Sequence, residues 1–158
     1  MTALAACGSS EQIKKAAPTV LLIDDDANTL IALGAILERH RIRVHDTEEE
    51  SGAIQWCHST EESIDVFVAD VILQNTNGPH VVRKLKVLQP SARVLFISGF
   101  DLKELSRRGL LSEADLTTGS VEFLQKPFAS EAFLEAVEKL ISARPSTKTY
   151  TCARQVDV

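Results

Sequence analysis

Apolar and polar positions alternate in blocks along the middle of the chain, and each block has the periodicity of one type of element. Short runs rich in Val, Leu, Ile and Phe predict β-strands, and three are apolar at nearly every position, which is typical of strands buried on both faces. The predicted strands are residues 19–23, 41–46, 65–69, 93–97 and 121–124. Longer segments with apolar residues at helical spacing predict helices over residues 27–40, 49–58, 79–88, 102–114 and 130–141. Asp26 and Ser130 are expected to cap the helices that begin beside them.

Strands that alternate with helices form βαβ units, so the pattern predicts an α/β fold with a parallel sheet covered on both faces. In such folds, ligands bind at the carboxyl ends of the strands, near a switch in strand order. The residues that directly follow the predicted strands are therefore the candidates for chemistry. They are Asp24, Asp25 and Asp26 after the first strand, Asp70 after the third, Ser98 and Gly99 after the fourth, and Lys126 and Pro127 after the fifth.

A pocket that gathers carboxylates, one hydroxyl and one ammonium group favours a particular chemistry. Carboxylates brought close together repel one another, and a hard divalent cation such as Mg²⁺ compensates them through oxygen ligands. An ionised aspartate beside a cation, a lysine and a serine hydroxyl suits phosphoryl transfer, in which a carboxylate oxygen is the nucleophile. The strand ends therefore predict a phosphoryl-accepting site that uses Mg²⁺.

Length and composition narrow the class of protein. The chain has 158 residues, which suits one ordinary domain, with 44% hydrophobic and 25% charged residues. Its net charge of −5 argues against a nucleic-acid partner, because such binders are usually basic. No apolar run approaches the ~20 residues of a membrane helix. Three widely spaced cysteines fit neither a disulfide framework nor a zinc site, which favours a reducing, cytoplasmic location.

The periodic pattern also divides the chain. Residues 19–142 carry it and are expected to fold as one domain, whereas residues 1–18 and 143–158 lack it and are expected to be flexible tails.

Four segments at the predicted strand ends resemble the receiver domain of two-component response regulators, over about residues 19–142. Each segment is weak evidence alone, but four segments in the family's order are specific evidence. The segment from Phe123 to Phe128 also resembles the receivers of hybrid sensor kinases. The resemblance implies a flavodoxin-like, doubly wound (βα)5 fold with a five-stranded parallel sheet. The segments are Val20-Leu21-Leu22-Ile23-Asp24-Asp25-Asp26, Val66-Phe67-Val68-Ala69-Asp70 followed by Asn77-Gly78, Val94-Leu95-Phe96-Ile97-Ser98-Gly99, and Phe123-Leu124-Gln125-Lys126-Pro127-Phe128.

The resemblance implies a role for each residue of the acidic pocket. Asp70 would be the phosphoacceptor. Asp25, Asp70 and the main-chain carbonyl of Ile72 would ligate Mg²⁺ directly, and Asp24 would hold it through water. Lys126 would pair with the Asp70 carboxylate and later with the phosphoryl group.

Two further residues resemble the family's switch. Ser98 would be the hydroxyl that moves toward the phosphoryl group, and Phe123 would be the aromatic residue that rotates inward with it. The Lys126–Pro127 bond is expected to be cis, and Asn77-Gly78 is expected to form a tight turn.

The sequence departs from the family pattern at two places. Gln74 stands where the family often has proline, which is expected to loosen the loop after the phosphoacceptor. More residues than usual separate Ser98 from Lys126, and the addition falls around residues 110–119. We expect the fourth helix, or the loop after it, to be enlarged.

The resemblance also implies partners. The protein would accept its phosphoryl group from a phosphohistidine on a histidine kinase or a histidine phosphotransfer protein, and would signal to a downstream protein target. It would assist its own phosphorylation and hydrolysis without being a conventional enzyme. Similar domains often dimerise through the last two helices, so a homodimer is one expected state. The chain could be a stand-alone protein or a part of a larger hybrid kinase.

Two other functions remain as alternatives. A phosphatase of the haloacid-dehalogenase-like class would use Asp24 as nucleophile, with Asp26 as a second acid. That class expects Thr or Val where Asn28 stands, and an acidic pair on a strand after Lys126, where the sequence predicts a helix. The other alternative is an interaction module on the same fold that works without phosphorylation.

Overall fold

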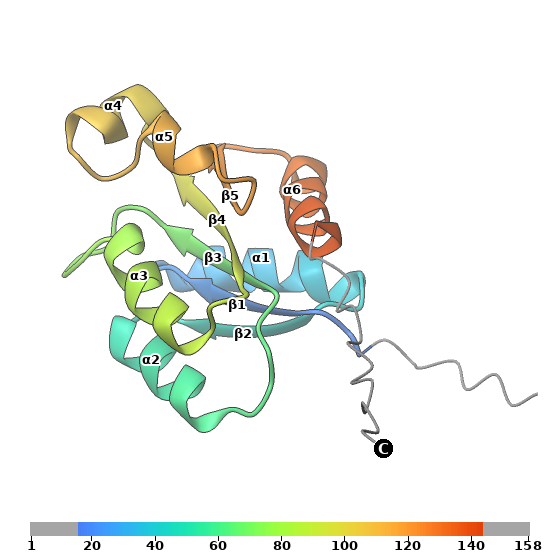
Figure 1. The fold of residues 1–158 in the computed structure, drawn as a ribbon. Coiled ribbons are helices and arrows are strands. Elements are labelled where there is room, and N and C mark those ends of the chain that lie inside the picture. Colours follow the sequence, from blue (N-terminus) through green and yellow to red (C-terminus); the bar gives the residue numbers. More distant parts are fainter. Residues whose placement is uncertain (1–15, 144–158) are drawn as a thin grey trace, which may run out of the picture.

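The computed structural model describes residues 16–143, which form a five-stranded parallel sheet between two layers of helices (Figure 1). The strand order is β2-β1-β3-β4-β5, so the connections change direction between β1 and β3. This confirms the predicted flavodoxin-like, doubly wound α/β fold. The elements in chain order are β1 Thr19–Ile23, α1 Ala27–Arg39, β2 Arg43–Thr47, α2 Glu50–Ser59, β3 Val66–Asp70, α3 Gly78–Leu88, β4 Arg93–Ser98, α4 Leu102–Arg107, α5 Glu113–Leu116, β5 Val121–Gln125 and α6 Ser130–Ser142.

Alternate side chains of the central strands enter two cores, one on each face of the sheet. On one face, Leu21 and Phe67 pack with residues of α2, α3 and α4. On the other face, Leu22 and Val68 pack with residues of α1 and α6. Every position of β1 and β3 is buried, which explains their almost continuous apolar runs. This burial on both faces holds the carboxyl ends of the two strands side by side.

The backbone explains two predicted boundaries that are wrong. The strand predicted from residue 41 begins at Arg43, because Arg41 has φ 60°, a left-handed conformation that a strand cannot include. Ser130 is not the N-cap of α6: that position is Ala129, and no side chain caps the helix.

The single helix predicted over residues 102–114 is also wrong, because the segment forms α4 and the one-turn α5. Gly109, with φ 68°, ends α4 in a Schellman motif. Its N–H donates to the carbonyl of Ser106, and the N–H of Leu110 donates to that of Leu105. α5 falls within residues 110–119, where the sequence predicts an enlarged segment.

Both ends of the described chain lie at the amino ends of the strands. The N–H of Arg43 donates to the carbonyl of Pro18 at 2.8 Å, and the Arg93 guanidinium donates to the carbonyl of Ala143. The flexible tails predicted at residues 1–18 and 143–158 fall outside the described residues, apart from residues 16–18 and 143. None of the helices in residues 16–143 is long and apolar enough to cross a membrane.

Candidate functional site

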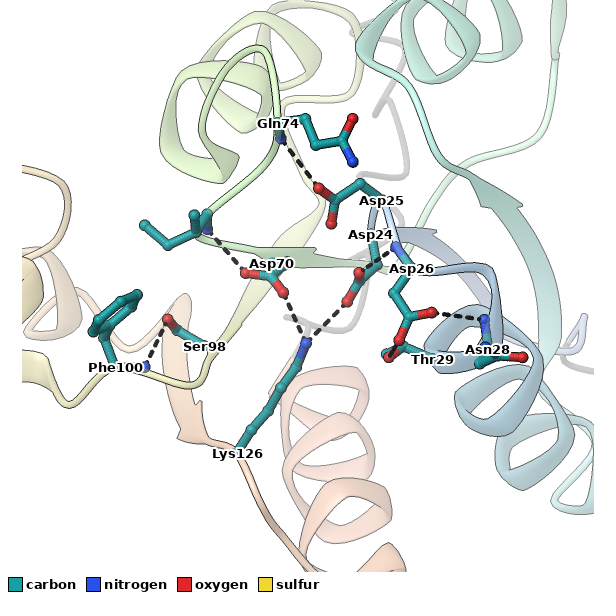
Figure 2. A network of polar contacts seen from close by, with 11 residues as sticks. Asp24, Asp25, Asp26, Asn28, Thr29, Asp70, Gln74, Ser98, Phe100 and Lys126 are labelled. Atoms are coloured by element: carbon teal, nitrogen blue, oxygen red, sulfur yellow. Dashed lines mark hydrogen bonds and ion pairs between the residues drawn. The ribbon is translucent and has the colours of Figure 1, made fainter.

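A buried ion-pair network joins the carboxyl ends of β1, β3 and β5 (Figure 2). The Nζ atom of Lys126 donates to Oδ2 of Asp70 at 2.7 Å and to Oδ2 of Asp24 at 3.1 Å. The side chains of Asp24 and Asp70 are only 2% and 11% exposed, and that of Lys126 is 28% exposed. One ammonium group therefore bridges two acidic side chains at the edge of the sheet where the sequence predicts chemistry.

The sheet topology brings these three residues together. Asp24 directly follows β1, and Asp70 is the last residue of the neighbouring strand β3. Lys126 directly follows β5, and its main-chain N–H donates at 2.8 Å to the carbonyl of Ser98 at the end of β4. The Lys126–Pro127 bond is cis, as predicted.

Loss of water dominates the electrostatics of the network. Burial raises the pKa of Asp24 above its ordinary value of 3.8, because the N–H of Asp26 and the ammonium of Lys126 offset the lost hydration only in part, and Asp70 adds repulsion. For Lys126, burial opposes the charge, but hydrogen bonds and attraction to Asp70 and Asp24 outweigh it and raise the pKa above 10.5. With both carboxylates ionised, one ammonium leaves the network with an excess negative charge that a further cation would reduce.

Asp25 lies beside this network but has a different partner. Its Oδ2 accepts a hydrogen bond at 3.1 Å from the main-chain N–H of Gln74, in the loop after β3. Figure 2 shows the Asp25 carboxylate directed toward that loop, whereas Asp24 and Asp70 point at Lys126. The main-chain N–H of Gln74 therefore connects the loop to the end of β1. The looser loop expected from the absence of proline at position 74 stays a prediction.

Within residues 16–143, no three Asp, Glu, His or Cys side chains lie together in an arrangement that could hold a metal ion. The carboxylates predicted as ligands are thus not gathered into a closed cluster. Any cation at this edge would be held by fewer carboxylates together with other oxygens.

Asp70 is also held by its own loop. Its Oδ1 accepts a hydrogen bond at 2.9 Å from the N–H of Ile72. Gly78 passes so close that a methyl group there would overlap the main-chain oxygen of Asp70 and lie 3.0 Å from its carbonyl carbon. Asn77 is the N-cap of α3, with its side chain accepting from the N–H of His80 at 2.9 Å, so a helix start replaces the predicted tight turn. The Asn77-Gly78 pair predicts a turn, but not the close main-chain approach to Asp70 that requires glycine here.

The two predicted switch residues lie on the adjacent strands. Ser98 is fully buried, and its Oγ accepts at 3.2 Å from the N–H of Phe100. Phe123 is half-buried opposite Phe96 and packs against the core that contains α3 and α4. The guanidinium carbon of Arg108 lies 4.3 Å from the centre of the Phe100 ring, which ties the end of α4 to the Ser98 loop. The switch roles of Ser98 and Phe123 stay predictions.

A family model for the response regulator receiver domain matches residues 20–138. The chain belongs to this family. The match runs from β1 into α6 and includes every residue of the acidic pocket. The protein is therefore a receiver domain of two-component signal transduction.

Curated proteins are similar to this chain over very different shares of their own length. The receiver is 30% identical over 109 residues to a cyclic di-GMP phosphodiesterase of Thermotoga maritima, covering 69% of this chain and 27% of the relative. It is 25% identical over 123 residues to the chemotaxis protein CheY of Bacillus subtilis, covering 78% of this chain and 97% of that protein. The chain thus spans about a quarter of the first relative and nearly all of the second.

Solved structures of response regulator proteins have folds similar to that of this chain. A response regulator receiver protein from Sinorhizobium medicae has 29% identity and a TM-score of 0.66, with 81% of this chain and 97% of that chain covered. A response regulator protein from Burkholderia pseudomallei, solved with a phosphorylated aspartic acid, a calcium ion and citrate, has 25% identity and a TM-score of 0.63, with 79% and 69% covered.

The phosphatase alternative receives no support. Asp26, the second acid of that chemistry, is exposed and is the N-cap of α1, as predicted. Its carboxylate accepts from the N–H of Asn28 at 3.1 Å and from the hydroxyl of Thr29 at 2.8 Å. The described chain after Lys126 continues into α6 rather than into a strand with an acidic pair.

Proposed function

We propose that Asp70 is the phosphoacceptor of this receiver. The observation that carries the proposal is the position of Asp70 at a strand end, with Oδ2 2.7 Å from the Lys126 ammonium. An oxygen of Asp70 would bond to phosphorus while the bond from phosphorus to the imidazole nitrogen of the donor histidine breaks, and the imidazole keeps the electron pair. The ammonium would neutralise charge on the equatorial oxygens during this transfer.

A bound Mg²⁺ belongs to the same proposal, and the donor set fits it. Asp25 and Asp70 offer hard oxygen ligands at neighbouring strand ends, beside a network with excess negative charge. Mg²⁺ usually takes one or two carboxylates and completes its shell with water and phosphate oxygens, so it does not need a closed cluster of three acids. Asp25, Asp70 and the carbonyl of Ile72 would hold the ion directly, and Asp24 through water. When bound, the ion would neutralise charge on the transferred phosphoryl group.

Ser98 and Phe123 would convert phosphorylation into a change of surface. The Ser98 hydroxyl accepts from Phe100, and a turn toward a phosphoryl group would replace that contact with a hydrogen bond that the hydroxyl donates. Phe123 would then rotate inward from β5. The Phe100–Arg108 contact supports α4 as the element that responds, since it joins the Ser98 loop to the end of that helix.

A receiver domain implies interaction with a histidine kinase or a histidine phosphotransfer protein. We further propose a downstream protein target that binds the face formed by α4 and α5, without direct contact with nucleic acid or membrane, and a homodimer through the last two helices as a second state. The receiver would act in the cytoplasm and would assist only its own phosphorylation and hydrolysis. The buried free thiol of Cys57 is compatible with that location.

The direct test is incubation of the purified protein with acetyl phosphate and Mg²⁺, followed by intact-mass measurement. The wild type should gain one phosphoryl group that hydroxylamine removes, and Asp70→Asn should gain none. Asp46→Asn, which alters an exposed carboxylate on β2, is the matched control and should gain it as the wild type does.

Two results would reject this function. One is a folded wild type that gains no phosphoryl group, and the other is an Asp70→Asn variant that still gains it. Peptide mapping distinguishes the alternative, because the phosphatase class predicts labelling of Asp24.

A further inference from the structure

The main-chain N–H of Gln74 contacts an acidic side chain that lies 49 positions away in the sequence. It donates at 3.1 Å to Oδ2 of Asp25. We propose that this N–H is a positioning group that orients the Asp25 carboxylate for Mg²⁺. The inference rests on the proposed function, because that function requires the cation.

The loop that carries Gln74 is closed at its base. Ile72 and Asn77 form an antiparallel bridge, and the N–H of Gly78 donates to the carbonyl of Val71 at 3.0 Å. The N–H of Ile72 also donates to Asp70, so the start of the loop is attached to the phosphoacceptor itself. Gln74 therefore lies at the tip of a closed loop, and its N–H is presented from a defined position.

Asp25 depends on this contact for its orientation. Its side chain is partly exposed, and the Gln74 N–H is its hydrogen-bond donor among the described residues. It lines a hollow of about 390 Å³ with Gln74 and the three glutamates 48–50. Without the donor, this partly exposed carboxylate would have no hydrogen-bond partner among the described residues to keep it from rotating into solvent.

The hydrogen bond leaves Asp25 able to bind a cation. It uses one oxygen, and a carboxylate has about four lone-pair sites on two oxygens. Hydrogen bonds from outside the metal shell fix the orientation of ligating carboxylates, and loss of such a partner typically weakens metal binding about 10- to 100-fold. A proline at position 74, which the family often has, has no N–H and could not make this contact. The hydrogen bond between the two loops therefore requires a residue other than proline at position 74, and this chain has glutamine there.

Two substitutions at one position separate the main-chain donor from the side chain. Gln74→Pro removes the N–H, and Gln74→Ala keeps it while removing the same side-chain amide. We expect isothermal titration with MgCl₂ to give a dissociation constant about tenfold weaker for Gln74→Pro, and one equal to that of the wild type for Gln74→Ala. Equal constants for all three proteins, or tighter binding by Gln74→Pro, would overturn the inference.

Amide hydrogen exchange of the wild type gives a second test that does not depend on the proline variant folding. The Gln74 amide should be protected, should lose protection in Asp25→Ala, and should remain protected at saturating Mg²⁺. An unprotected amide, or one that Mg²⁺ exposes, would mean that the contact is absent or competes with the cation, and either result overturns the inference. If Asp70 is phosphorylated while Gln74→Pro binds Mg²⁺ normally, only this inference fails. If the wild type binds no Mg²⁺, both it and the cation role in the proposed function fail.

Discussion

Lys126 Nζ lies 2.7 Å from Asp70 Oδ2, although the two residues are 56 positions apart and β4 separates their strands in the sheet. The same ammonium is 3.1 Å from Asp24. Two buried carboxylates therefore share one cationic side chain. The balance of charge among these three groups therefore contributes to the stability of the fold.

Replacement of Lys126 by methionine should destabilise the protein. The substitution would leave two buried carboxylates without their ammonium partner, and we expect the free energy of unfolding at pH 7 to fall by about 3 kcal/mol. Urea unfolding in a chelating buffer without divalent cations measures this change. Lys139→Met is the control, because Lys139 pairs with Glu122 on the surface and is 68% exposed. The control should unfold as the wild type does, and an equal loss in both variants would contradict a special role for the buried lysine.

Replacement of Asp24 by asparagine should stabilise the protein at neutral pH. Because burial raises the pKa of Asp24, the folded state holds its proton more tightly than the unfolded state, so its contribution to stability is full below pH 3.8 and is lost as the pH rises through the raised pKa. The amide introduced by Asp24→Asn does not ionise, so the variant keeps its stability as the pH rises. In chelating buffer, the difference in unfolding free energy between variant and wild type should be near zero below pH 3.8 and should grow above it. A difference independent of pH would contradict the assignment.

Replacement of Gly78 by alanine should distort the loop that holds Asp70. The added methyl group would meet the main-chain oxygen of Asp70 and would lie 3.3 Å from Cα of Val71, and neither main-chain atom can move like a flexible side chain. We expect a loss of about 2 kcal/mol in unfolding free energy, and slower phosphorylation by acetyl phosphate.

Gly34→Ala provides the comparison for that glycine. Gly34 lies within α1, and the nearest atom to an added methyl group is Cγ1 of Val44 at 3.8 Å. This variant should gain about 0.5–1 kcal/mol, because alanine favours a helix interior over glycine. Equal effects in the two variants would show that the close approach at Gly78 does not matter.

Cys57 should be unreactive in the folded protein. Its side chain extends from α2 into the core, and burial raises the pKa of the thiol to about 11. Because the thiolate is the reactive form, iodoacetamide at pH 8 should label Cys57 only after urea is added. Peptide mapping by mass spectrometry reads this position separately from the other two cysteines. Rapid labelling in native buffer would contradict the burial.

The arrangement of the strands was predictable because the central ones are buried on both faces. The runs at residues 19–23 and 65–69 are nearly all apolar, so their elements and their polar ends could be recognised. Parallel strands end at one edge, and Asp24 and Asp70 meet there for that reason. Lys126 could be recognised in the same way, as a charged residue after the fifth predicted strand. Its pairing with Asp70 across β4 was implied only by the resemblance to receivers.

Features that depend on main-chain atoms were not predictable in the same way. The donor to Asp25 is a backbone N–H, which every residue except proline carries, so Gln74 has no signal of its own beyond the absence of proline. The close approach of Gly78 to Asp70 depends on the path of the loop. Gly109 is different, because a glycine inside a helical pattern is a break signal, and it lies where residues 102–114 divide into α4 and α5.

The hydrogen bonds of Pro18 with Arg43 and of Ala143 with Arg93 hold residues 18 and 143 at the amino ends of the strands. Asp24, Asp70 and Lys126 lie at the opposite, carboxyl ends of the strands. A fluorophore, an affinity handle or a surface linker attached at either of these positions would stay remote from an incoming phosphohistidine. Real-time assays of phosphotransfer on an immobilised receiver should therefore report the behaviour of the free molecule.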